Sequence, residues 1–94
     1  MDFDWSDPPF DPKTGPSLQQ IEESLEDPLG LRFYPDSPRF TRESRTFSLG
    51  RTIGGQGIFS VYRSDGRKVR VIATRVMTPG EEAFYDRKAA EWTS

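Results

Sequence analysis

Polar and apolar residues alternate from Lys68 to Val71 and an apolar run continues to Ala73, a pattern that predicts the β-strand over residues 68–76 around which the rest of the chain is arranged. β-Branched side chains dominate the segment, which fits a half-buried pleated surface. Val69 and Val71 fall on one face and Arg70 on the other, because side chains alternate along a strand. Arg75 shares the parity of Val71, although a twist or a bulge near the end of the strand would re-aim it.

A helix is predicted directly after this strand, from residue 79 to about residue 92. Thr78 is a suitable N-cap, a proline follows at the first helical position, and Glu81 completes a capping box. Phe84 and Trp92 recur at helical spacing, which predicts that both face the core.

Two more strands are predicted before the central one, at 45–53 and 58–63. Three glycines within 54–57 supply the positive φ angles of a hairpin turn, and the Asp-Gly pair within 64–67 is a second hairpin signal. Consecutive strands joined by tight turns form an antiparallel meander.

The first half of the chain predicts shorter elements. Residues 1–16 form a proline-rich arm, in which four prolines exclude both a helix and a central strand. Ser17 opens a helix with a capping box and an apolar stripe, and Pro28 ends it. A short strand is predicted at 31–34, followed by a polar loop over 35–44.

We therefore expect a single α+β domain over residues 1–94. Its small antiparallel sheet consists of the three-strand meander plus one or two short strands, with the two helices mainly on one face. The other face is then available for binding.

The amino-acid composition limits the kinds of functional site that the chain can form. The chain contains no cysteine and no histidine, which excludes disulfides, thiolate metal sites and histidine-based catalysis. We expect no metal, no cofactor and no membrane partner, since no apolar run is long enough to span a bilayer. A reducing cytoplasm is compatible with this composition.

Acidic and basic residues are concentrated in different parts of the chain. Residues 1–31 hold eight acids and one base, whereas residues 45–75 hold seven bases and one acid. Strand arginines on the solvated face of a half-exposed sheet would account for the basic segment. The more specific interpretation of the basic segment is a face of the sheet that binds a polyanion.

Five arginines on neighbouring strands are the candidates for such a face: Arg45, Arg51, Arg63, Arg70 and Arg75. Guanidinium groups present forked donors that suit phosphate, and they remain charged. RNA cleavage without histidine is chemically feasible, because arginine can stabilise the charge on a phosphate attacked by the 2′-hydroxyl. The alternative for each arginine is a surface ion pair of small energetic value.

The most specific motif is Arg70-Val71-Ile72-Ala73-Thr74-Arg75, followed by a capped helix that contains Glu81, Glu82 and Tyr85. Upstream lie Lys13-Thr14-Gly15, the first predicted helix and Asp27-Pro28. In these features the chain resembles the BrnT family, ribonuclease toxins of bacterial toxin–antitoxin pairs with a RelE-like fold. The resemblance is strongest between residues 45 and 85.

The resemblance implies an endoribonuclease that cleaves mRNA, with or without the ribosome, and so inhibits translation in the cytoplasm. It implies a ribbon-helix-helix antitoxin as the partner and a dimer or a toxin–antitoxin heterotetramer as the assembly. Transferred onto this sequence, the catalytic candidates are Arg45, Arg70, Arg75 and Tyr85. The RNA-binding candidates are Arg51, Arg63 and Lys13.

Two departures from the family leave an alternative open. Thr14 stands where the family has a histidine, and the chain is acidic overall whereas the family is typically basic. Both departures fit a catalytically silent module that keeps the fold and its partner surface.

Overall fold

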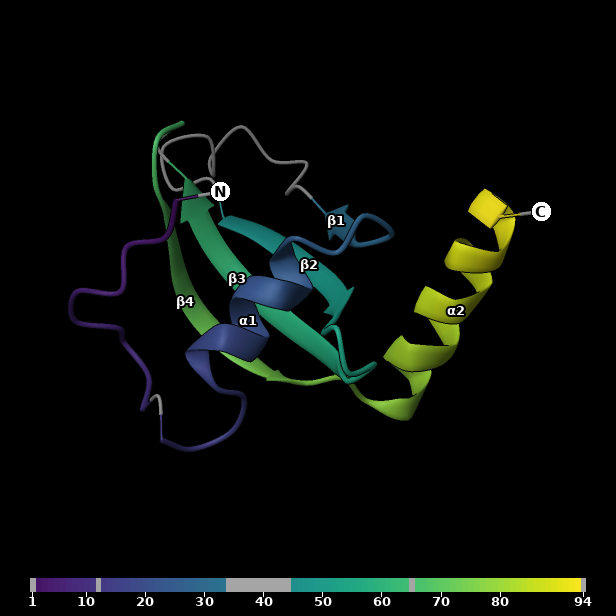
Figure 1. Cartoon of the computed structure of the whole chain (residues 1–94), viewed down its shortest axis with the longest axis horizontal. Helices are drawn as coiled ribbons and strands as arrows, with labels where there is room; N and C mark the ends of the chain where they lie inside the picture. The colour runs from purple at the N-terminus through teal and green to yellow at the C-terminus, as the bar shows by residue number, and fades with distance from the viewer. Residues whose placement is uncertain (1, 12, 34–44, 65, 94) are drawn as a thin grey trace.

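The computed structural model describes residues 2–11, 13–33, 45–64 and 66–93, and it contains one four-stranded antiparallel sheet (Figure 1). The strands lie in the order in which they occur in the chain: β1 (Leu31–Phe33), β2 (Arg45–Arg51), β3 (Gly57–Ser64) and β4 (Val69–Val76). The α+β class and the three-strand meander are confirmed, with β1 as the additional short strand. The loop predicted over 35–44 falls outside the described residues.

The two predicted helices are α1 (Leu18–Leu25) and α2 (Pro79–Thr93). Each begins with a capping box, in which the N-cap hydroxyl and the side chain three residues later exchange hydrogen bonds with each other's backbone. Ser17 and Gln20 form the first box, and Thr78 and Glu81 form the second. Local sequence therefore fixes where both helices begin.

Helix α1 packs on the face of the sheet that carries Tyr62 and Val71, here named the α1 face. Its buried residues Ile21 and Leu25 form one core cluster with this face. Gly50 permits the close approach, because a Cβ atom there would meet the carbonyl oxygen of Ser24.

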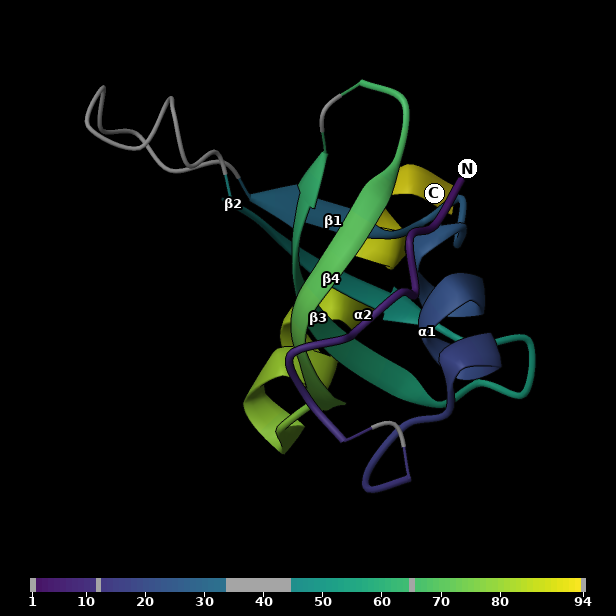
Figure 2. The same cartoon turned by 90° about the vertical axis from the view of Figure 1, so that its left-hand side faces the viewer.

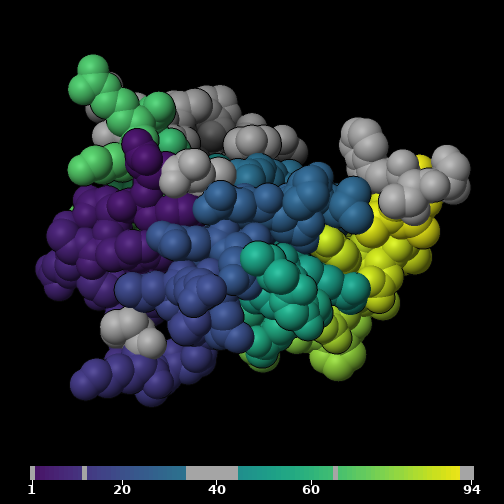
Figure 3. Space-filling view, viewed as in Figure 1, coloured from purple at the N-terminus to yellow at the C-terminus, as the bar shows by residue number. Residues whose placement is uncertain are grey.

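The N-terminal arm completes this cluster. Phe3 forms a parallel bridge with Val69 at the outer edge of β4, and the aromatic residues that follow pack against the α1 core. The indole Nε1 of Trp5 donates a hydrogen bond of 2.9 Å to Glu22 of α1. In the space-filling view the arm lies directly against α1 (Figure 3). The predicted arm thus adds core side chains without being a full strand.

Helix α2 packs on the opposite face, so the expectation that both helices lie mainly on one face is wrong. Tyr85 and Phe84 belong to a second core cluster with Leu49 and Phe59, and the last two residues define the α2 face. The physical reason is that the sheet carries large apolar side chains on both faces, Tyr62 and Val71 on one and Leu49 and Phe59 on the other, so each face is covered by its own helix. Figure 1 shows α1 over β2 and β3, whereas α2 stands beyond the ends of the strands.

Two smaller differences concern the ends of elements. Strand β2 ends at Arg51, two residues before the predicted end, and Ile53 is 90% exposed in the turn that follows. Trp92 lies within α2, but its side chain is outside the described part of the structure, so its expected packing stays a prediction.

Candidate functional site

Three of the candidate arginines lie side by side on the α2 face. Arg45 of β2 is directly opposite Arg63 of β3, which is directly opposite Arg70 of β4. All three are exposed, and no carboxylate in the described ranges forms an ion pair with any of them. Like charges directly opposite one another destabilise a sheet. Arg45, Arg63 and Arg70, here named the arginine row, therefore concentrate positive charge. A bound anion would reduce the repulsion among them.

The first residues of the arm approach one end of the arginine row. A guanidinium nitrogen of Arg70, Nη2, donates a hydrogen bond of 3.2 Å to the backbone carbonyl of Asp7. The pKa of Asp4 is lowered, mainly by hydrogen bonds from Ser6 and to a smaller extent by the charge of Arg70. The acceptor on Asp7 is a backbone carbonyl, so this hydrogen bond orients the Arg70 side chain without forming an ion pair.

A β-bulge sets which face Arg75 occupies. Val61 pairs with Ala73 whereas Tyr62 pairs with Val71, which leaves Ile72 as the extra residue of β4. Simple alternation would place Arg75 opposite to Arg70. The bulge instead brings both arginines to the α2 face, as bulges do when they re-aim side chains.

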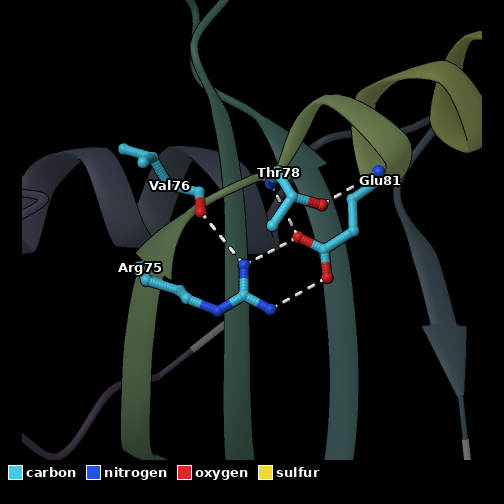
Figure 4. A network of polar contacts seen from close by, with 4 residues as sticks. All are labelled: Arg75, Val76, Thr78 and Glu81. Atoms are coloured by element: carbon cyan, nitrogen blue, oxygen red, sulfur yellow. Dashed lines mark hydrogen bonds and ion pairs between the residues drawn. The ribbon is translucent and has the colours of Figure 1, made fainter.

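Arg75 is held by the start of α2 (Figure 4). Its guanidinium donates two hydrogen bonds to the carboxylate of Glu81, with N–O distances of 2.7 and 2.9 Å, and it lies 4.3 Å from the ring centroid of Phe59. The hydrogen bonds from Arg75 are the main reason why the pKa of Glu81 falls to about 2. Arg75 lies four residues along the sheet from the arginine row, about 13 Å away. Its charge is thus locally compensated.

Arg51 and Tyr85 belong to a second polar cluster, which ties α2 to the segment after α1. The guanidinium of Arg51 forms an ion pair of 2.8 Å with Asp86 and lies 4.9 Å from the ring centroid of Tyr85. The Tyr85 hydroxyl donates to Asp27, whose carboxylate also accepts from the backbone N–H of Arg51. Burial first, and then the hydrogen bond to Asp27, raise the pKa of Tyr85 to about 12. The hydroxyl therefore stays protonated at neutral pH and holds α2 in place.

Lys13 and Thr14 are not brought to the arginine row. They belong to the part of the arm that precedes α1, and this segment lies at the end of the molecule opposite to the β3–β4 hairpin (Figures 1 and 2). The hydroxyl of Thr14 donates to the backbone carbonyl of Asp11, which closes a turn in this segment. Position 14 is thus separated from the arginine row.

Sequence reasoning missed three aromatic residues beside the arginine row: Phe33, Phe47 and Phe59, here named the aromatic strip. Phe33 pairs directly with Phe47 across β1 and β2. The rings of Phe47 and Phe59 stack, with centroids 6.1 Å apart. The signal was present in the strand parity, because Phe47 shares a face with Arg45 in the strand predicted over 45–53.

The described ranges contain no gathered group of three or more acidic side chains that could hold a metal ion. No helix within them is both long and apolar enough to cross a bilayer. The chain matches no protein-family model, no curated protein and no solved structure.

Proposed function

We propose that this chain binds RNA on the α2 face of its sheet and cleaves it, as the toxin of a two-gene toxin–antitoxin module in the cytoplasm. A small ribbon-helix-helix antitoxin would neutralise it. The observation that carries the proposal is the arginine row, in which Arg45, Arg63 and Arg70 lie in register on three adjacent strands and are exposed.

The physical argument concerns phosphate. Three guanidiniums on adjacent strands offer forked donors to consecutive phosphates of one strand of nucleic acid. Each phosphate neutralised on a single strand contributes about −0.7 to the slope of log K against log salt concentration, so three contacts predict a slope of about −2. Relief of the repulsion within the row adds to the drive for binding.

Cleavage would use the positive charges of the same arginine row. The 2′-oxygen attacks the adjacent phosphorus, the bond to the 5′-oxygen breaks, and a 2′,3′-cyclic phosphate and a 5′-hydroxyl result. The arginine row stabilises the negative charge that develops on the phosphate oxygens. The Tyr85 hydroxyl is engaged with Asp27 and does not carry a proton in this step. The proton of the 2′-hydroxyl therefore passes to water, and a proton from water reaches the leaving 5′-oxygen. Without a general acid or base the rate falls by about 10²- to 10⁴-fold.

A catalytically silent interaction module is the second candidate, and a specific observation favours it. Two of the four catalytic candidates already have carboxylate partners inside the protein: Glu81 binds Arg75, and Asp27 binds Tyr85. Such a module would keep its partner surface without cutting RNA.

The test compares two variants that each remove one positive charge. Arg63→Gln removes the central arginine of the row, whereas Arg87→Gln, the matched control, changes an exposed arginine of α2. Binding of a labelled single-stranded RNA is followed by fluorescence anisotropy at several salt concentrations. We expect Arg63→Gln to weaken binding and to reduce the salt slope by about 0.7, and Arg87→Gln to leave both unchanged.

Cleavage is measured on the same RNA by gel electrophoresis, with Arg70→Ala as the second variant. Loss of cleavage in this variant supports the ribonuclease, and a growth defect on induction that the neighbouring gene relieves supports the two-gene module. RNA binding without cleavage favours the silent module. Binding that is absent, or that does not weaken as salt is raised, contradicts the proposal.

A further inference from the structure

The aromatic strip borders the arginine row on the same face of the sheet. Phe47 is two residues from Arg45 along β2, a spacing of about 7 Å, and Phe33 is its direct cross-strand partner. Phe47 in turn stacks on Phe59. A ligand whose phosphates lie on the arginine row therefore extends over aromatic rings.

Two rings of the strip remain accessible. Phe33 and Phe47 are 40% and 37% exposed, whereas Leu49, the next residue of β2 on that face, is 5% exposed beneath α2. Phe59 is less accessible, because the guanidinium of Arg75 covers it. Phe33 and Phe47 are thus the rings that can receive a ligand; Phe59 stacks on Phe47, and Phe84 of α2 packs against Phe33.

We infer that this protein selects unpaired RNA, whose bases stack on Phe47 and Phe33 while its phosphates bind the arginine row. Every base has a flat π-face, and stacking of one base on an aromatic side chain contributes enough to change affinity by about 5- to 150-fold. In a duplex those faces are covered by neighbouring bases, so a duplex would meet only the arginines. The inference rests on the proposed function and adds the substrate class to it.

Charge favours nucleic acid over a protein as the occupant of this surface. An apolar protein partner would have to bury three arginines without paired acids, which is costly. A single-stranded polyanion that carries planar bases satisfies both the arginine row and the aromatic strip.

The test uses three labelled ligands of equal length at one salt concentration: single-stranded RNA, the same strand in a duplex, and a ribose-phosphate strand without bases. We expect the full-length protein to bind the base-bearing single strand at least 5-fold more tightly than the abasic strand. This comparison needs no variant.

The second arm uses Phe47→Leu, which keeps an apolar side chain but removes the flat ring. Ile53→Ala is its control, since Ile53 is exposed in the turn after β2. We expect Phe47→Leu to weaken binding of the base-bearing strand by at least 5-fold and to leave binding of the abasic strand unchanged.

The outcomes separate the two ideas. Equal binding of the abasic and base-bearing strands, or tighter binding of the duplex, overturns the selection of unpaired bases while RNA binding itself stands. Failure of all three ligands to bind overturns the proposed function as well, and would point to a protein as the occupant of this face.

Discussion

Replacing Gly50 by alanine tests how closely α1 lies on the sheet. A Cβ atom at position 50 would be 1.9 Å from the carbonyl oxygen of Ser24 and 2.8 Å from its carbonyl carbon. Both are backbone atoms of α1, so no side-chain rotation can remove the clash. Ordinary contact begins at 3.4 Å, which means that α1 would have to retreat by about 1.5 Å, the difference between 3.4 and 1.9 Å.

That retreat would loosen the α1 core. Ile21 and Leu25 are 0% and 1% exposed, and a gap of even 0.5–1 Å forfeits about a quarter to a half of the dispersion attraction. Overpacking alone costs about 1–3 kcal/mol. We therefore expect Gly50→Ala to lower the free energy of unfolding by about 3 kcal/mol or more, a large share of the stability of a small domain.

Urea unfolding followed by circular dichroism measures this loss. With an m-value of about 1.5 kcal/mol/M, a loss of 3 kcal/mol lowers the midpoint by about 2 M. Gly54→Ala is the control, because its Cβ would meet nothing closer than 3.8 Å and it should stabilise the protein by about 0.4–1 kcal/mol. Equal midpoints for the two variants would mean that α1 does not contact β2 as described.

Two further predictions follow from the polar contacts of α2. Tyr85→Phe should lower the free energy of unfolding by about 1.5–3 kcal/mol, since Asp27 loses a hydrogen bond, and should abolish a tyrosine titration near pH 12. In the parent protein that contribution is complete below pH 10 and declines as the pH rises toward 12. The Glu81 contribution is present above pH 4.5 and declines as the pH falls toward 2, so the thermal midpoint of Glu81→Gln should depend less on pH in this window. Because this variant weakens the hold on Arg75, it should also bind RNA more tightly; unchanged affinity would leave Arg75 outside the interface.

The elements were predictable where the signals are local. Ser17 and Thr78 each carry a capping box within four residues, and the glycine turns fix the antiparallel order of the meander. The faces taken by the two helices were not predictable in this way. Both Leu49 and Tyr62 look like core residues in the sequence, and only tertiary packing decides which helix covers each of them.

The positions of the candidate arginines were also predictable only in part. Arg45 and Arg63 share a face because a tight hairpin sets their register, and the sequence is sufficient to propose this. The face on which Arg75 lies depends on the bulge at Ile72, and no residue type in β4 predicts a bulge at that position. The separation of Lys13 from the row depends on the path of the arm, which a proline-rich sequence leaves open.

The bridge between Phe3 and Val69 has a consequence for the order of folding. The arm is synthesised before the strand edge that it pairs with, so its aromatic side chains cannot complete their packing until β4 has formed. Contacts between distant parts of a sequence slow folding, because the entropy of closing the intervening loop is lost before the contact is gained. The α1 core is therefore completed late, and a nascent chain that stops before Val69 would expose Phe3 and Trp5 to solvent or to chaperones.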